Sequence, residues 1–254
     1  MLLVQAPVED TIELDHSIFL LKVLSPEITS IIKPGQFLNI RVTNKPYPLL
    51  RRPFSACDVD GEYLMLMFNV MGEGTSILAH KPKGAPVDIL GPLGNGFNLE
   101  DDYDTAVVVG GGMGAAPFPF LQRILKGKKE ILTFIGGRTH KDIITYGMEN
   151  LHTATDDGSE GLKGNVVDLL NEKLDLLKSK KIKIFACGPE QMLKAIQLFI
   201  NELDIPTQFS VESYMACGIG ICQGCAIESI DSVKKYYLVC KDGPVFNAKE
   251  VRFG

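Results

Sequence analysis

Four of the six cysteines in this 254-residue chain fall between positions 217 and 240. They are Cys217, Cys222, Cys225 and Cys240, and their spacing is C-x4-C-x2-C followed by one distant cysteine. Three glycines lie among the first three cysteines, so the backbone can curl and bring several thiolates together. This spacing is typical of a plant-type [2Fe-2S] cluster, whose irons are held by cysteine thiolates. We therefore predict that these four cysteines are metal ligands.

Two other uses of the cysteines stay open at the level of sequence. Four thiolates also suit tetrahedral Zn²⁺, although structural zinc sites usually contain two short cysteine knuckles and this chain has only one. A disulfide is less favoured because residues 1–10 have neither the cationic start nor the long apolar run of a secretory signal. Zinc is thus the main alternative to an iron–sulfur cluster.

The bulk composition is that of an ordinary soluble globular protein, with 45% hydrophobic and 22% charged residues. A net charge of -5 argues against a basic surface for nucleic acid. No stretch approaches the roughly 18 apolar residues that a membrane helix needs. We expect a cytoplasmic protein, in which cysteines stay reduced, with two compact domains and a small additional module.

Residues 1–100 are predicted to form an antiparallel β-barrel or sandwich. Short apolar runs at 18–23, 37–42 and 63–68 are separated by Pro-Gly and Asp-Gly turn signals. The stretch Gly91–Phe97 is rich in glycine and proline, and we expect it to close this domain as an irregular loop.

Two elements of this first domain are suited to a phosphate. The run Arg51-Arg52-Pro53-Phe54-Ser55 offers a forked guanidinium, a rigid turn and a short hydroxyl donor. Gly72-Glu73-Gly74-Thr75 follows an apolar strand and begins a helix whose free amides favour an anion. A plain surface arginine pair remains the alternative for the first element, because the match is short.

From residue 101 to 210 the pattern changes to alternating strands and helices, which predicts an α/β domain with a doubly wound parallel sheet. Buried strands are expected at 105–109, 130–135 and 183–186. Ligands of such sheets bind beyond the carboxyl ends of the strands, where the glycine turns gather.

The first of these turns contains Gly110, Gly112 and Ala115 in the spacing G-x-G-x-x-A, which lets a backbone approach a pyrophosphate. The alternative is an ordinary turn between a strand and a helix, because this motif alone is weak evidence for a nucleotide site. Arg138 could meet a 2'-phosphate or be a surface cation. Asp156 and Asp157 could bind a ribose or simply be solvated.

These motifs, in this order, resemble the ferredoxin-NADP reductase superfamily. Arg52-Pro53-Phe54-Ser55 is similar to the family's flavin motif R-P-x-S, Gly74-Thr75 to its pyrophosphate contact, and Cys187-Gly188-Pro189 to its C-G-P turn beside the nicotinamide. Within the superfamily the chain resembles most the electron-transfer subunits of NAD-dependent class 1B dihydroorotate dehydrogenases, over essentially its whole length.

The resemblance implies three domains with three cofactors. They are an FAD-binding barrel at 1–100, an NAD-binding domain at 101–210 and a [2Fe-2S] module at 211–254. The implied cofactor-binding residues are Arg52, Pro53, Phe54, Ser55, Met67, Phe68, Asn69, Gly74, Thr75, Gly110, Gly112, Gly114, Cys187, Gly188 and Pro189. The implied cluster ligands are Cys217, Cys222, Cys225 and Cys240.

The resemblance also implies a function in pyrimidine biosynthesis. Electrons from an FMN-containing dihydroorotate dehydrogenase catalytic subunit would pass through the cluster and FAD to NAD⁺, in a heterotetramer with two of each subunit. This chain would have no dihydroorotate site and no catalytic residue of its own. We expect its last module to contact the catalytic subunit through the apolar residues Ile219 and Ile221.

Two alternative functions are kept. A sister group comprises the small subunits of NADH-dependent ferredoxin:NADP oxidoreductases and sulfide dehydrogenases, but it typically has aspartate at the first ligand position, where this chain has Cys217. The other alternative is a binding protein with a flavin fold and a structural zinc.

Overall fold

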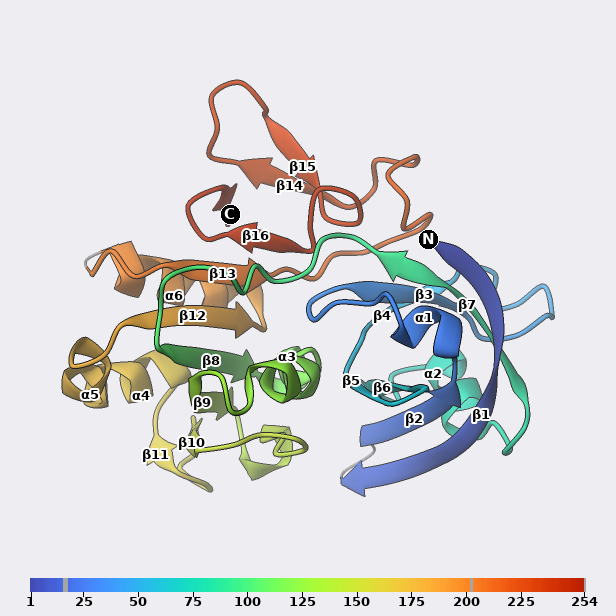
Figure 1. Ribbon diagram of the computed structural model, residues 1–254, viewed down its shortest axis with the longest axis horizontal. Coiled ribbons are helices and arrows are strands. Elements are labelled where there is room, and N and C mark those ends of the chain that lie inside the picture. Colours follow the sequence, from blue (N-terminus) through green and yellow to red (C-terminus); the bar gives the residue numbers. More distant parts are fainter. Residues whose placement is uncertain (16–17, 202, 254) are drawn as a thin grey trace.

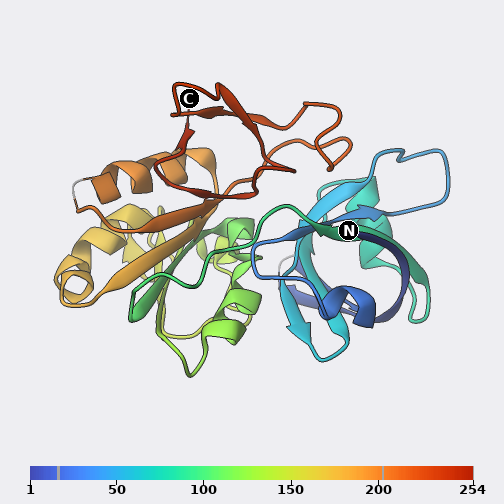
Figure 2. The same ribbon diagram turned by 45° about the horizontal axis from the view of Figure 1, so that its top comes forward.

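The structure, a computed structural model, describes residues 1–15, 18–201 and 203–253 and has three parts (Figure 1). A curled antiparallel sheet, called the barrel below, lies beside a mostly parallel sheet covered by helices, called the α/β domain. The C-terminal segment forms a small module, called the cysteine module, along one side of the α/β domain (Figure 2). The predicted fold class is confirmed.

The barrel has seven strands in the order β4-β3-β7-β1-β2-β6-β5. Its interior is filled by alternate residues of these strands, as the period of two requires. Two short helices, α1 (Pro26–Thr29) and α2 (Glu73–Ala79), complete it. The strands are β1 (Leu2–Asp15), β2 (Ile18–Leu24), β3 (Phe37–Arg41), β4 (Arg52–Ser55), β5 (Asp58–Asp60), β6 (Tyr63–Asn69) and β7 (Pro86–Leu93).

The predicted loop at Gly91–Phe97 is wrong in its first part. Residues 91–93 continue strand β7, where Gly91 pairs with Leu2 and Leu93 pairs with Phe37. A register shift in the β3–β7 ladder lies next to Pro92. A bulge of this kind tolerates a proline, which has no N–H to donate to the ladder.

The α/β domain is built on the sheet order β11-β10-β9-β8-β12-β13-β16. Strand β8 is buried along its whole length because helices cover both faces of the sheet. Ala106 and Val108 pack with helix α3, whereas Val107 and Val109 pack with α4 and α6. The strands are β8 (Thr105–Gly111), β9 (Glu130–Gly137), β10 (Leu151–Thr155), β11 (Leu162–Lys163), β12 (Ile182–Cys187) and β13 (Thr207–Ser210).

The helices of this domain are short. They are α3 (Phe118–Leu125), α4 (Val166–Glu172), α5 (Leu174–Lys178) and α6 (Glu190–Asn201), with 3-10 turns at Gly112–Ala115 and His140–Asp142. Within the described part of the chain, none of them has the length and apolar character needed to cross a membrane.

The cysteine module is tied into the α/β sheet. Its strand β16 (Val245–Asn247) pairs antiparallel with β13, so the chain returns to add an edge strand to the preceding domain. The remaining strands form a separate small sheet in the order β15-β14-β17. These are β14 (Ala226–Ser229), β15 (Tyr236–Leu238) and β17 (Val251–Arg252). The cysteine module therefore has its position fixed by main-chain hydrogen bonds.

The barrel and the α/β domain share an ionic and an apolar contact. Arg123 of α3 donates through Nε and a terminal nitrogen to the two carboxylate oxygens of the buried Asp58 in β5, at 2.7 and 2.5 Å. Met67 of β6 packs in one cluster with Ala115 and Ala116. An ion pair with two parallel hydrogen bonds resists rotation of one domain against the other, and the apolar contact resists their separation. The two sheets therefore hold one orientation.

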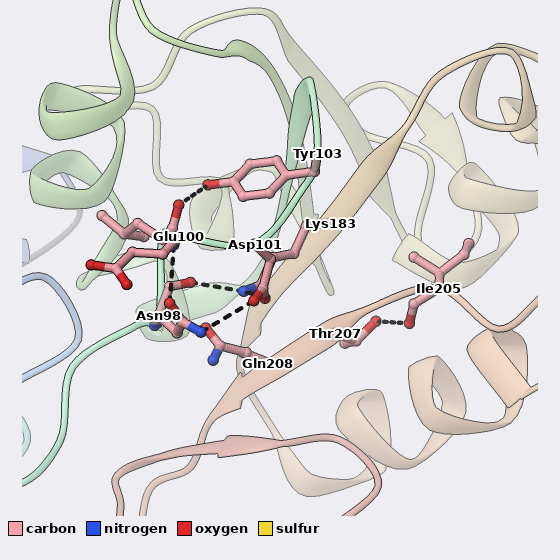
Figure 3. A network of polar contacts seen from close by, with 9 residues as sticks. Asn98, Glu100, Asp101, Tyr103, Lys183, Ile205, Thr207 and Gln208 are labelled. Atoms are coloured by element: carbon pink, nitrogen blue, oxygen red, sulfur yellow. Dashed lines mark hydrogen bonds and ion pairs between the residues drawn. The ribbon is translucent and has the colours of Figure 1, made fainter.

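The connection between the two sheets is held by a buried lysine (Figure 3). Lys183 of β12 is 1% exposed, and its Nζ donates to the carboxylate of Asp101 and, at 2.8 Å, to the carbonyl oxygen of Asn98. The backbone N–H of Asn98 in turn donates to Gln208 Oε1 at 3.0 Å. A buried ammonium needs such partners, so the connecting segment is fixed to the sheet.

Replacing this lysine should therefore destabilise the protein. We expect Lys183→Ala to lower the free energy of unfolding by about 2 kcal/mol, because the carbonyl of Asn98 loses its donor and Asp101 its counter-ion. Lys181→Ala removes an exposed ion pair with Asp102 and serves as the matched control, with no measurable change. The midpoint of thermal unfolding of the two variants is the measurement; equal midpoints would contradict this role.

Candidate functional site

The four predicted ligand cysteines lie in two pairs. The backbone N–H of Cys222 donates to Cys217 Sγ at 3.4 Å, and the backbone N–H of Cys240 donates to Cys225 Sγ at 3.4 Å. Cys225 and Cys240 are buried, at 2% and 3% exposure, whereas Cys222 is exposed. The second pair is therefore buried, whereas the first pair reaches the surface at Cys222.

Backbone amides of the loop point at two of these sulfurs. Cys217 Sγ accepts N–H groups from Cys222 at 3.4 Å and from Ile219 at 3.5 Å, and Cys240 Sγ accepts that of Gly220 at 3.1 Å. Burial would raise the pKa of Cys217, but these backbone donors outweigh it and lower the pKa to about 6. Burial and the neighbouring Cys225 raise the pKa of Cys240 to about 12.

This arrangement fits a two-iron cluster. Each iron of a [2Fe-2S] centre takes two cysteine thiolates, so two pairs of thiols are the donor set that it needs, and amides directed at the sulfurs favour its negative charge. Tetrahedral zinc needs four ligands round one point.

The buried pair of cysteines shares a core with the barrel. Cys225 and Cys240 belong to the same apolar cluster as Phe37 of β3 and Leu93 of β7. The ligand loop, residues 217–225, thus rests against two strands of the domain that carries the predicted flavin motif.

The predicted flavin residues lie on neighbouring parts of the barrel. Arg52 on β4 lies against Gly74 in α2, where a Cβ would come 3.3 Å from the Nε of the arginine. Thr75 Oγ1 accepts the N–H of Met71 at 2.9 Å and so closes the turn before α2. The two predicted phosphate-binding elements are therefore adjacent. Arg52 can lie this close to α2 because residue 74 is a glycine.

The other predicted flavin residues divide between surface and core. Pro53, Ser55 and Asn69 are partly exposed. Phe54 and Phe68 are buried inside the barrel, where their ring centroids are 5.5 Å apart. Their side chains support strands β4 and β6 from inside, and Met67 lies in the contact with the α/β domain.

A cavity of about 690 Å³ lies at the carboxyl ends of the parallel strands. Gly112 and Pro189 line it from two different strand ends, and Asn69 lines it from the barrel. Several residues that line the cavity were not predicted from the sequence, because they belong to no recognised motif. They are Asp142, Asn165, Val166, Gln191 and Met192. Asn165 also caps α4, and this N-cap position is the one signal that could have identified it.

Two glycine turns meet at the base of this cavity. A Cβ on Gly114 would clash with the carbonyl oxygen of Cys187 and with Gly188, so the first turn can touch the C-G-P turn only because residue 114 is glycine. A Cβ on Gly110 would come 2.7 Å from Ile135 Cδ1 and 3.3 Å from Ala115 Cα. The structure thus brings Gly110, Gly112, Gly114, Cys187, Gly188 and Pro189 together.

The structure distinguishes between Arg138, Asp156 and Asp157, whose roles the sequence left open. Asp156 and Arg138 line the cavity, whereas Asp157 lies outside it and accepts hydrogen bonds from the backbone and hydroxyl of Ser159. Arg138 lies 3.8 Å from Asp142, a carboxylate on the same wall. Two carboxylates thus line this part of the cavity beside one guanidinium.

Family models match two parts of the chain. Residues 212–252 match the iron–sulfur cluster binding domain of dihydroorotate dehydrogenase B, and residues 108–198 match the oxidoreductase NAD-binding domain. Curated relatives carry the name dihydroorotate dehydrogenase B (NAD(+)), electron transfer subunit. The one from Geobacillus sp. (strain WCH70) is 39% identical over 230 residues, 86% of each chain. The one from Bacillus velezensis is 36% identical over 258 residues, 96% of each chain.

Solved structures share the fold. A structure of an NADH-dependent reduced ferredoxin-NADP oxidoreductase matches with a TM-score of 0.85 at 27% identity, over 98% of this chain and 90% of that chain. The ferredoxin reductase in carbazole 1,9a-dioxygenase matches with a TM-score of 0.68 at 20% identity, over 82% of this chain and 68% of that chain, which is a likeness of fold alone.

The two cysteines that are not predicted cluster ligands should be unreactive in the folded protein. Burial raises the pKa of both Cys57 and Cys187, and the nearby carboxylates of Asp58 and Glu212 raise it further. Both thiols therefore stay protonated at a pH of about 8.5, at which a free cysteine is half ionised. We expect iodoacetamide at that pH to modify neither in the native protein and both after unfolding. Peptide mass mapping measures this; modification of native Cys187 would show that its thiol is accessible and ionised.

Proposed function

The chain belongs to the family of dihydroorotate dehydrogenase B electron transfer subunits, and from this premise we propose that it carries electrons from a dihydroorotate-oxidising partner subunit to NAD⁺. The observation that carries the proposal is the place of the barrel: β3 and β7 support the cysteine loop, while Asn69 of β6 reaches the cavity of the α/β domain. The flavin domain is thus in contact with both other sites.

Three groups of residues would hold the cofactors. Arg52 and the turn at Gly74 and Thr75 would anchor the FAD phosphates, and the strand Arg52–Ser55 would support the flavin ring. The two cysteine pairs would hold [2Fe-2S]. When bound, the flavin supplies the exchange between hydride chemistry at a nicotinamide and single-electron chemistry at a cluster.

The cavity of the α/β domain is suited to NAD(H). Gly112 lines it in the turn after β8, where the backbone can come close to a pyrophosphate, and the carboxylate of Asp156 can accept hydrogen bonds from a ribose diol. Asp142 on the same wall pairs with Arg138 and so reduces the attraction of that guanidinium for a 2'-phosphate.

We propose that the partner is an FMN-containing catalytic subunit and that the complex holds two copies of each. The name of the relatives supports a partner, since each is called a subunit. All six cysteines are free, which supports a reducing compartment, and we propose the cytoplasm. The mass of the purified complex, by light scattering, tests the stoichiometry.

One alternative keeps the same fold. The likeness to the NADH-dependent ferredoxin-NADP oxidoreductase structure supports a subunit that serves another acceptor. The complete set of four cysteines favours the dihydroorotate reading, because Cys217 occupies the position at which the sister group typically has aspartate. Dihydroorotate-dependent reduction of NAD⁺ by the complex of both subunits distinguishes the two readings.

Removing one cluster ligand tests the relay. We expect Cys222→Ala to abolish the cluster's visible absorption and the dihydroorotate-dependent reduction of NAD⁺, while the FAD content per chain is unchanged because the barrel is untouched. The control Cys57→Ala changes a cysteine outside the loop and keeps both signals. Full turnover by Cys222→Ala would refute electron transfer through this site.

The partner should dock where the cysteine loop is exposed. Ile221, next to the ligand Cys222, is 75% exposed, so a charge there disturbs an interface without disturbing the fold. We expect Ile221→Glu to weaken assembly with the catalytic subunit at least tenfold and to leave NADH oxidation with an artificial acceptor unchanged. Leu198→Glu on α6, at a residue that is 64% exposed, is the matched control and should assemble normally. Normal assembly of Ile221→Glu would place the interface elsewhere.

A further inference from the structure

Asn39 connects the barrel to the first cysteine of the loop. It lies on β3, is 1% exposed, and its Nδ2 donates to the main-chain carbonyl oxygen of Cys217 at 3.3 Å. The bond joins a strand of the flavin domain to a predicted cluster ligand far along the chain.

The contact around this amide is close. Gly218 has φ +70°, and a Cβ at this position would come 2.5 Å from Asn39 Nδ2. The ligand loop therefore lies directly on the amide group, and residue 218 must be glycine for both its backbone conformation and its neighbour. A change of residue 39 therefore acts on the loop by direct contact.

The barrel itself makes little use of this side chain. Asn39 Oδ1 is buried and has no hydrogen-bond partner in the described part of the chain. A buried acceptor without a donor costs free energy, so an apolar residue of the same shape would suit the barrel better. Among the described residues, the side chain makes its one hydrogen bond with Cys217, and this points to a role outside the barrel.

The strand beneath the amide is held firmly. The main-chain oxygen of Asn39 accepts an N–H of Arg51 at 3.1 Å, and Arg51 is paired with Asp88 at 2.6 Å. Asn39 also lies opposite Pro53 in the β3–β4 register. Side chains that are paired in this way share one face of the sheet, so the amide is a neighbour of the predicted flavin strand.

We propose that Asn39 is a positioning residue for the cluster. By holding the carbonyl of Cys217, it fixes the turn whose N–H groups, from Ile219 and Cys222, are directed at Cys217 Sγ. Hydrogen bonds to the cluster sulfurs stabilise the reduced, more negative state, so Asn39 holds the reduction potential up. This inference rests on the proposed function, since it needs a [2Fe-2S] cluster on the four cysteines.

The test compares Asn39→Leu with wild type as the full chain with its cofactors. Leucine has nearly the shape of asparagine but removes both the donor and the unpartnered acceptor. We expect an unchanged FAD content and thermal midpoint, together with an altered EPR spectrum of the reduced cluster and a more negative midpoint potential in an EPR-monitored redox titration. Loss of the cluster with FAD retained would support the same role.

The control removes a similar bond elsewhere. Asn171, on α4, donates through its side-chain amide to the carbonyl of Val167 at 3.0 Å, within the α/β domain. Asn171→Leu should leave the EPR spectrum and the potential as in wild type. If Asn39→Leu does not fold, Asn39→Val, which suits a strand and also loses the donor without adding a charge, decides by the same readouts.

Two outcomes distinguish a failure of the role of Asn39 from a failure of the proposed function. A loaded Asn39→Leu protein with the wild-type spectrum and potential would overturn the role of Asn39 and leave the relay standing. A wild-type protein that shows no [2Fe-2S] signal after reduction would instead overturn the proposed function, because the cysteines would then not carry the cluster.

Discussion

The cysteine loop has no core of its own, and the structure depends on how the other two parts supply one. Cys225 and Cys240 are buried in an apolar cluster that also contains Phe37 and Leu93 of the barrel. A close contact below the loop adds to this: the backbone N–H of Asn95 donates to the carbonyl of Gly243 at 2.6 Å. Thiolates can be held in two fixed pairs only if this junction is rigid, because small loops rich in glycine do not hold a single conformation by themselves.

The same constraint explains why the three parts form one body. The pairing of β16 with β13 fixes the cysteine module to the α/β sheet, and the fork between Asp58 and Arg123 fixes that sheet to the barrel. Electron transfer between cofactors requires them to be close and fixed, and the chain meets this need with main-chain pairing, one ion pair whose carboxylate is buried, and a shared apolar core. The buried Lys183 adds a fixed connection between the first two parts.

Much of the local structure could be predicted from the sequence, because its signals have a short range. Apolar runs and glycine turns indicated most of the strands at which motifs begin or end, and the cysteine spacing indicated the kind of metal centre. Reasoning of this kind failed at Gly91–Leu93, where glycine and proline suggested a loop. There the partner strands decided the outcome, since β1 and β3 pair on either side of these residues.

The sequence by itself determined the chemistry that the chain can offer: four thiolates with glycines between them, a guanidinium next to a rigid turn, and glycine turns after buried strands. These depend on residue type and near neighbours, which a sequence states directly. Only the tertiary structure decided that Cys217 pairs with Cys222 and Cys225 with Cys240, that Asp156 and not Asp157 faces the cavity, and that Asn39 supports the ligand loop. Each of these relations joins side chains through the packing of separate sheets, and no periodicity along the chain encodes how two sheets meet.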